Sequence, residues 1–294
     1  AVQSNTNFAT VAAILKAGGK PIFMDMTKEY FCPNLQILKT TYSKYKIEAV
    51  LWVHIGGIIT PDFEDISNFC KKEGLILIED CAHSHGSFLN GKSAGNFGDG
   101  GAFSFFPTKV MTTMEGGMII TNNDAHAESI KSYRNQGKRK AAYGGLHYDL
   151  GNSWRINELQ AYMGIIFLRK LDQMISKRQK AVDIISSKLD KAEISYCDTR
   201  HMDKASQYKF IINLKNGQEM TKIKKLLAEK GIFCGGGVYE TACHDQPVFD
   251  DIKYDEGDLA VTSKECPNHI CPPITSGTTE EDANYIANEL IRIL

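Results

Sequence analysis

Two ionisable residues lie beside apolar segments, where a charge is costly unless it is paired or used in chemistry. Asp80 ends the apolar segment LILIED at 75–80, and Lys109 lies in a polar turn between the apolar segments 102–105 and 118–121. A carboxylate at such a position needs a cationic partner. A desolvated lysine loses its proton readily, and lysine is the only side chain that forms an imine with an aldehyde cofactor. The pair is therefore a candidate for chemistry on an aldehyde.

Each of the two residues also has a simpler interpretation. An aspartate at the end of a strand often caps a helix or forms a salt bridge, and most lysines lie on loops at the surface. Taken singly, neither residue separates a structural role from a catalytic one. The decision depends on the elements that position Asp80 and Lys109 and on the motifs around them.

Short apolar segments rich in β-branched residues predict strands. Apolar residues at helical spacing between the segments 47–53 and 75–80 predict a helix. Thr60 and Pro61 are expected to begin this helix, and Gly74 to end it. Strands that alternate with helices imply an α/β fold with a mostly parallel sheet. In such a sheet ligands bind at the carboxyl ends of the strands, where Asp80 lies. The predicted strands are 21–24, 47–53, 75–80, 102–105 and 118–121.

The second half of the chain has a different pattern. Apolar residues recur on one helical face from Ile156 to Leu189, including Leu159, and predict a long connecting helix. A smaller α+β unit follows, with a strand at 208–214, a helix at 219–230 and a last helix that Thr278 and Glu281 would cap. We therefore expect a large domain at residues 1–172 and a small C-terminal domain at residues 173–294.

The composition excludes several classes of protein. The chain has 294 residues, of which 43% are hydrophobic, and its formal net charge is -1, so disorder, nucleic-acid binding and membrane binding are all poor interpretations. Its apolar runs are far shorter than the roughly 20 residues of a membrane span. The eight cysteines form no CxxC pair, which indicates reduced thiols and a cytoplasmic protein. Cys266 and Cys271 lack a matching ligand pair, so no metal site is predicted.

Several segments, in order, resemble the DegT/DnrJ/EryC1/StrS sugar aminotransferases, which have the aspartate aminotransferase fold (fold type I) of pyridoxal-phosphate (PLP) enzymes. The resemblance is strongest around the two candidate residues and extends in weaker form over essentially the whole chain. The matching segments are Glu79–Asp80, AHSHG at 82–86, KSAGNFGD at 92–99, SFFPTK at 104–109 and EGGM at 115–118.

The resemblance implies a role for each matching residue. Lys109 would form the Schiff base with pyridoxal 5'-phosphate and then move a proton between the substrate carbon and the cofactor. Asp80 would pair with the pyridine nitrogen and keep it protonated. His83 would lie beside the ring and its phenolic oxygen, and Ser104 would bind the phosphate.

The segment LGNSWRINELQAYMG at 150–164 resembles a family segment that reaches into the neighbouring subunit's active site. The resemblance therefore implies a homodimer with a shared active site. Asn152 or Ser153 would contact the partner's cofactor phosphate. Arg155 would hold the carboxylate of the amino donor, or else form a salt bridge between subunits. His244 matches a family histidine in the substrate loop of the small domain.

Two features depart from the family pattern. Asn7 stands where relatives have an aromatic residue that stacks on the cofactor, so stacking would come from Phe8, from His83 or from neither. The chain also begins at Ala1 and lacks the N-terminal Ser-Gly-Thr turn with which relatives bind the phosphate. We expect the sequence to be a fragment of a longer protein; the alternative is a phosphate site that is built differently.

The resemblance implies a transamination in which an amino acid, glutamate in relatives, aminates a keto-sugar that is usually nucleotide-linked. Two alternatives stay open. One is a PLP-dependent sugar dehydratase, although such relatives have histidine where this chain has Lys109. The other is a catalytically inactive or regulatory member of the same fold. A nucleotide-binding protein is disfavoured because neither a G-x-G-x-x-G nor a phosphate-loop motif occurs.

Overall fold

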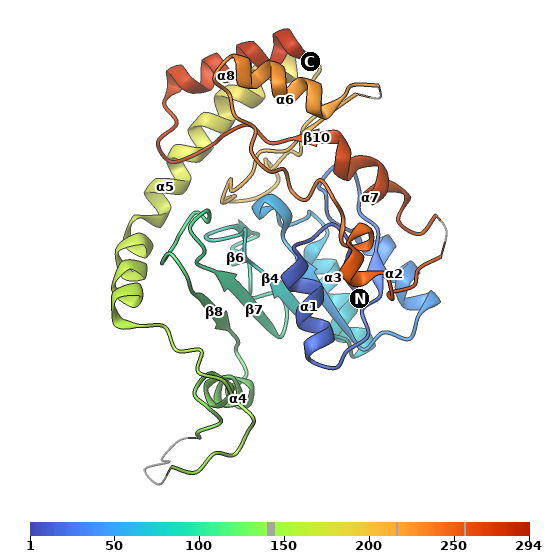
Figure 1. Ribbon diagram of the computed structural model, residues 1–294, viewed down its shortest axis with the longest axis vertical. Helices are drawn as coiled ribbons and strands as arrows, with labels where there is room; N and C mark the ends of the chain where they lie inside the picture. The colour runs from blue at the N-terminus through green and yellow to red at the C-terminus, as the bar shows by residue number, and fades with distance from the viewer. Residues whose placement is uncertain (140–144, 216, 256) are drawn as a thin grey trace.

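The computed structural model describes residues 1–139, 145–215, 217–255 and 257–294 (Figure 1). A six-stranded sheet with the order β2-β1-β3-β4-β7-β8 forms its centre. All neighbouring strands are parallel except β7 and β8, which are antiparallel. The predicted α/β fold with a mostly parallel sheet is therefore confirmed. The strands of this sheet are β1 (Val2–Gln3), β2 (Phe23–Met24), β3 (Ala49–Val53), β4 (Ile76–Asp80), β7 (Gly100–Ser104) and β8 (Gly117–Ile120).

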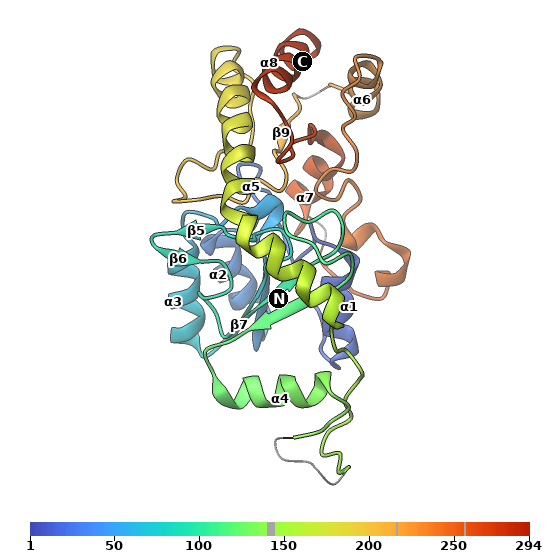
Figure 2. The same ribbon diagram turned by 90° about the vertical axis from the view of Figure 1, so that its left-hand side faces the viewer.

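Helices lie on both sides of the sheet, and Figure 2 shows α1 and α3 on opposite sides. A long helix, α5, runs from the edge of the sheet to the second, smaller unit, where α6 and α8 lie (Figure 1). The helices are α1 (Phe8–Lys16), α2 (Leu35–Lys44), α3 (Phe63–Glu73), α4 (Asp124–Arg134), α5 (Glu158–Lys191), α6 (Met220–Glu229), α7 (Ala260–Glu265) and α8 (Glu280–Ile293). Short 3-10 helices span Ile55–Gly57, Cys243–Asp245, Pro247–Phe249 and Cys266–Asn268.

The main hydrophobic core lies between the sheet and the α2–α3 layer. Trp52 of β3 and Phe63 of α3 are fully buried, and their rings lie 5.3 Å apart. Phe63 also contacts Phe97, which lies in the loop before β7, at a ring distance of 5.1 Å. Burial of aromatic side chains of this size contributes strongly to stability. The core thus joins three elements next to the carboxyl ends of β3 and β4.

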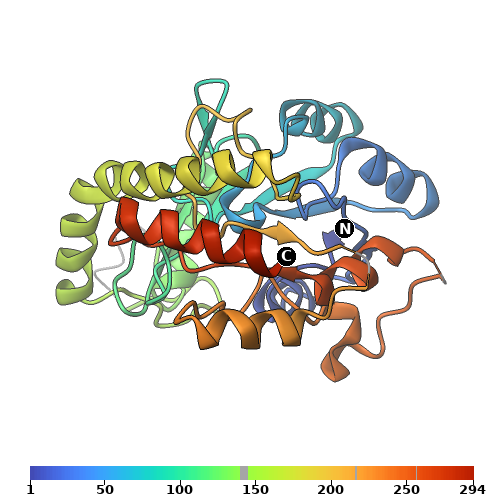
Figure 3. The ribbon, with the colours of Figure 1, turned by 90° about the horizontal axis from the view of Figure 1, so that it is seen from above.

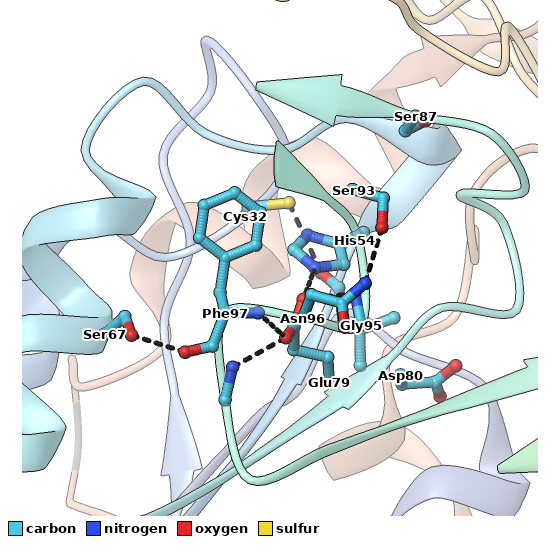
Figure 4. A network of polar contacts seen from close by, with 12 residues as sticks. Cys32, His54, Ser67, Glu79, Asp80, Ser87, Ser93, Gly95, Asn96 and Phe97 are labelled. Atoms are coloured by element: carbon cyan, nitrogen blue, oxygen red, sulfur yellow. Dashed lines mark hydrogen bonds and ion pairs between the residues drawn. The ribbon is translucent and has the colours of Figure 1, made fainter. Parts of the chain in front are cut away.

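Strand β4 places two adjacent carboxylates on opposite faces of the sheet, because side chains alternate along a strand. Glu79 points into the interior and is fully buried. Asp80 points away from it, as Figure 4 shows. The adjacent residues Glu79 and Asp80 therefore place one carboxylate in the core and the other on the opposite face of the sheet.

The Glu79 carboxylate holds the loop that precedes β7. One of its oxygens binds the ring Nε2 of His54 at 2.9 Å and accepts from the backbone N–H of Gly95 at 2.7 Å. The other oxygen accepts from the N–H groups of Phe97 and Gly98 at 2.7 and 2.8 Å (Figure 4). Burial opposes ionisation, but His54 and these donors leave the pKa of Glu79 below its usual value.

The smaller unit has its own hydrophobic core, which α5, α6 and α8 share. Ile185 and Leu189 of α5, Leu227 of α6 and Leu290 of α8 are fully buried in it. Figure 3 shows α8 running alongside the C-terminal part of α5. The two short strands of this unit are β9 (Ile212–Asn213) and β10 (His269–Ile270), which pair antiparallel. A second two-stranded ribbon, β5 (Phe88–Leu89) with β6 (Lys92–Ser93), lies beside the main sheet.

Three predicted boundaries were wrong by small amounts. The helix α3 begins at Phe63 with Asp62 as its N-cap position, not at Thr60, because residues before Phe63 form a turn. The predicted strand 208–214 is a strand only at 212–213. The last helix has its capping box one residue later, between Thr279 and Asp282. In each case the type of element was predicted correctly, and the position of its ends was not.

The predicted apolar face of α5 does not lie against the core over its whole length. The helix is continuous through residue 172, so the domain boundary placed there stays a prediction. Its C-terminal half contains most of its buried residues, including Ile175 and Ile185. Leu159, which was assigned to the same face, is 83% exposed. The first turns of α5 therefore present apolar side chains that residues 1–139, 145–215, 217–255 and 257–294 leave uncovered.

We expect Glu79→Gln to lower the free energy of unfolding by about 3 kcal/mol. A glutamine has only one acceptor oxygen, so its amide group would face either a backbone N–H or the His54 ring. Chemical denaturation measures the loss. The exposed Glu229 at the end of α6 provides the control, because Glu229→Gln changes the same charge without burying the new amide. Equal stability of the two variants would contradict the structural role of Glu79.

Candidate active site

Asp80 lies at the carboxyl end of β4, beside β3 and β7. One of its oxygens accepts a hydrogen bond from the Thr10 hydroxyl at 2.8 Å, and the other accepts from the Ala82 N–H at 3.0 Å. The Thr6 hydroxyl donates in turn to Thr10 at 3.0 Å. Two threonines from the start of the chain therefore fix the orientation of the Asp80 carboxylate.

Lys109 lies in the turn between β7 and β8, and its ammonium nitrogen is 4.9 Å from the centre of the Tyr208 ring. Burial lowers the pKa of Lys109 from 10.5 to about 8; Asp80 partly opposes this shift, and the positive charge of Lys209 adds to it. Lys109 and Asp80 therefore act on one another electrostatically. A neutral amine, which is the nucleophilic form, becomes available near neutral pH.

His83 follows β4 by three residues and is buried beside Lys109. Its ring stacks on Tyr208 at a centroid distance of 4.3 Å, and its Nδ1 accepts a hydrogen bond from the Gly56 N–H at 3.2 Å. Burial, followed by the charges of Lys109 and Lys209, holds the pKa of His83 well below its usual value. The imidazole is therefore neutral at physiological pH.

Ser104 ends β7 next to these groups, and its hydroxyl oxygen accepts from the Phe106 N–H at 3.3 Å. This bond does not use the hydroxyl proton. His85 is also buried close to Lys109. Its ring lies against the backbone of Ser104, whose carbonyl stabilises the protonated imidazole. Burial is the main cause that lowers the pKa of His85 to about 4.

This set of groups fits pyridoxal phosphate. It contains an amine with a lowered pKa for the aldehyde, an anchored carboxylate for the ring nitrogen, an imidazole and a hydroxyl donor for a phosphate oxygen. Asp80, His83, Ser104 and Lys109 come from the carboxyl ends of β4 and β7 and the turns that follow them, which is where open α/β sheets bind ligands.

The structure places Asn152, Ser153 and Arg155 apart from this group. They are exposed on the segment that connects α4 with α5, which Figure 1 shows near α4 and away from the end of β4. The Arg155 guanidinium donates to the Asn135 side chain at 2.9 Å. A role in this chain's own site would require a large movement, and a role in a partner's site stays a prediction.

His244 lies in the interior, not on an open surface. Its Nδ1 is 2.6 Å from the Ser4 hydroxyl and its Nε2 is 2.9 Å from the Ser263 hydroxyl. Burial is the main cause that lowers its pKa. With both ring nitrogens occupied, His244 joins β1 to α7 in this structure, and direct contact with a substrate stays a prediction.

The structure separates the candidates for stacking on the cofactor. Phe8 stacks on Phe249 at a centroid distance of 5.5 Å, on the side of α1 that faces the C-terminal segment. Asn7 caps α1 by accepting from the Ala9 N–H at 2.9 Å. Of the predicted stacking candidates, His83 is the one whose ring lies beside Lys109.

The ligand atoms of His54, Glu79 and Cys81 lie within 4.8 Å of one another. Both Glu79 oxygens already bind N–H donors and the His54 ring, as described above. Burial, followed by the negative charge of Glu79, holds the pKa of Cys81 well above its usual value, so the thiol is protonated and a poor ligand. The geometry therefore favours a structural role for this cluster.

Three residues near the site were missed in the sequence. Thr10 orients Asp80, and Tyr208 and Tyr239 both lie against His83. Thr10 lies on the polar side of an otherwise apolar helix, and Tyr239 follows the loop Gly235–Gly237, so each had a weak signal. Tyr208 had none, because it begins a predicted strand like many tyrosines.

A model of the DegT/DnrJ/EryC1/StrS aminotransferase family matches residues 1–291. The chain is 30% identical over 286 residues to the pleiotropic regulatory protein of Geobacillus stearothermophilus. The alignment covers 97% of this chain and 75% of the relative. It is also 34% identical over 188 residues to GDP-perosamine synthase of Vibrio cholerae. This alignment covers 64% of this chain and 50% of the relative.

Solved structures of aminotransferases share the fold. DesV of S. venezuelae matches with a TM-score of 0.90 at 22% identity, over 99% of this chain and 77% of that chain. PseC of Helicobacter pylori, an aminotransferase involved in the biosynthesis of pseudoaminic acid, matches with a TM-score of 0.89 at 22% identity, over 99% of this chain and 78% of that chain. The chain belongs to the DegT/DnrJ/EryC1/StrS aminotransferase family.

Proposed function

We propose that this protein is a PLP-dependent aminotransferase that moves an amino group from an amino acid, glutamate in the first instance, to a keto group of a nucleotide-linked sugar. The observation that carries the proposal is the half-buried Lys109, whose lowered pKa makes its amine nucleophilic beside the Asp80 carboxylate. Relatives named as sugar transaminases support the substrate class, among them GDP-perosamine synthase of Vibrio cholerae and a dTDP-3-amino-3,4,6-trideoxy-alpha-D-glucose transaminase of Micromonospora megalomicea.

When bound, pyridoxal phosphate supplies an aldehyde that condenses with an amine and a pyridinium ring that accepts the electrons of a carbanion. Lys109 would hold the cofactor through Nζ, and its amine would carry a proton from and to the substrate carbon. Asp80 would pair with the ring nitrogen, and its bonds to Thr10 and Ala82 hold it in one orientation. Ser104 would donate a hydrogen bond to the phosphate.

Two alternatives to this proposal are a sugar dehydratase and a regulatory protein. A dehydratase, GDP-4-keto-6-deoxymannose-3-dehydratase, shares the fold with a TM-score of 0.89, so fold alone does not separate the two reactions. Lys109 favours transamination. The relative named as a pleiotropic regulatory protein keeps the regulatory alternative open, and the lowered pKa of Lys109 supports a catalytic site.

We expect the full chain, reconstituted with PLP, to absorb visible light and to lose this absorption when glutamate converts the cofactor to its amine form. Borohydride added before glutamate should fix the cofactor covalently on Lys109, which peptide mass spectrometry detects. Lys109→Arg, which keeps the positive charge, should lose both the visible absorption and the covalent product. Visible absorption that glutamate leaves unchanged would favour the regulatory alternative.

The rate at which the apo-protein takes up PLP should rise with pH and level off above a midpoint near pH 8, because only the neutral Lys109 amine reacts with the aldehyde. An ordinary lysine would show a midpoint about two units higher. Asp80→Asn should move the midpoint below that of the wild type, since the carboxylate raises the Lys109 pKa. Stopped-flow absorbance measures the rates. A wild-type rate that keeps rising beyond pH about 10 would contradict the assignment.

We also propose a homodimer in which Asn152 or Ser153 and Arg155 complete the partner's site. A large apolar surface supports this, because monomers rarely expose such patches without a partner. Leu150 is 97% exposed and Trp154 is 68% exposed on the connecting segment. They lie on the same part of the chain as the predicted partner-site residues. Further exposed apolar residues follow on the first turns of α5 and on β8: Leu159, Tyr162, Leu168, Met118 and Ile119.

A charge on this surface should separate the subunits. We expect Leu159→Asp to raise the dissociation constant of the dimer by about 100-fold or more, because the carboxylate would have to be buried without a partner. Sedimentation equilibrium measures the effect. Leu226→Asp on α6 is the matched control and should leave the dimer intact. If Leu159→Asp sediments like the wild type, this surface is not the dimer interface.

The location of the protein is proposed as the cytoplasm. All eight cysteines are buried and free, as expected where thiols stay reduced. Among the described residues, no helix combines the length and apolarity needed to cross a membrane.

A further inference from the structure

Tyr239 has a backbone conformation that side chains of its size rarely adopt. Its φ angle is +65°, in the left-handed region that glycine and asparagine favour. Residues held in such conformations cluster at functional sites, where the surrounding structure determines them. Tyr239 follows the glycine-rich loop Gly235–Gly237 and lies outside the residues assigned so far.

Neighbouring residues hold Tyr239 in place. The Val238 N–H donates to Nε2 of the buried His269 at 2.9 Å. The Glu240 carboxylate accepts from the Gly237 N–H at 3.0 Å and forms an ion pair with Lys224. Tyr239 therefore sits between two anchored residues, and its conformation is imposed by contacts on both sides.

The side chain of Tyr239 is directed into the site. Its hydroxyl oxygen is 3.4 Å from the His83 Nε2, and the two rings are 15° from parallel with their centres 6.0 Å apart. Burial, followed by the negative charge of Asp80, raises the pKa of Tyr239. The hydroxyl therefore stays protonated and faces the same space as His83 and Asp80.

The tautomer of His83 follows from its other contact. The Gly56 N–H donates to His83 Nδ1, and a backbone amide can only donate. Nδ1 must therefore carry no proton. Because the ring is neutral, its one proton lies on Nε2, which makes Nε2 the donor and the Tyr239 oxygen the acceptor. The hydroxyl of Tyr239 then has its own proton to donate.

We propose that Tyr239 is a further cofactor-binding residue: its oxygen accepts from the His83 Nε2–H, and its own O–H donates to the phenolic oxygen of the cofactor. The inference rests on the proposed function only for the identity of the cofactor. The imidazole N–H is used in holding the tyrosine, so the tyrosine O–H is the donor that this pair offers to a phenolic oxygen. Tyr239 is not assigned a proton transfer.

Binding of two cofactors to the full-length chain tests the inference. The probes are PLP and the analogue of PLP that lacks the phenolic hydroxyl, and absorbance titration gives both dissociation constants. Tyr239→Phe should weaken PLP binding about fivefold, which corresponds to one neutral hydrogen bond, and should weaken binding of the analogue less than twofold. Tyr42→Phe, which removes a hydroxyl bonded to Glu73, should change neither constant.

The outcomes separate this inference from the proposed function. If the wild type binds neither probe, the proposed function fails. If the wild type binds PLP but Tyr239→Phe weakens both probes equally, or weakens neither, Tyr239 has no role toward the phenolic oxygen and the inference is overturned.

The tautomer is tested separately on the wild-type apo-protein. This measurement does not depend on whether Tyr239→Phe folds. Nitrogen-15 NMR of the wild type should show the His83 proton on Nε2, with the signal identified by its loss in His83→Gln. A proton on Nδ1 would overturn the inference.

Discussion

The site depends on the alternation of side chains along β4. Because neighbouring residues of a strand point to opposite faces, Glu79 and Asp80 carry out different tasks although they are adjacent. Glu79 is buried and binds His54 and the loop before β7. That loop leads directly into the strand that ends at Ser104, and Lys109 follows five residues later. A carboxylate in the core thus helps to set the distance between Asp80 on one face and the lysine that belongs with it.

The environment of Lys109 shows how two opposing effects set a pKa. Burial favours the neutral amine, and the Asp80 carboxylate favours the ammonium; burial has the larger effect. The balance leaves a carboxylate available for a cationic ring nitrogen and an amine available for an aldehyde. Thr10 contributes by bonding one Asp80 oxygen from a different element, so the orientation of the carboxylate does not depend on Lys109 alone.

Much of the fold was predictable because its signals are local. The strands of the main sheet, the ending of α3 at Gly74 and the long α5 all follow from period and from glycine placement. The motifs around Asp80 and Lys109 located the centre of the site. Tyr208 and Tyr239 were missed because they are more than 100 residues from Asp80 in the chain, and only the packing of the smaller unit brings them to His83. The exposure of Leu159 was missed for the converse reason: a helical period shows that a face is apolar but not which molecule covers it.

The length of α5 has a mechanical consequence. Its 34 residues are helical throughout, a path of about 50 Å at 1.5 Å per residue, and the helix bends along its course (Figure 2). One end carries the exposed apolar side chains, and the other is packed into the core of the smaller unit. Because the helix is continuous, a shift of the smaller unit would be carried along it to the first turns. The position of the smaller unit and that of the exposed apolar side chains are therefore joined through a single helix.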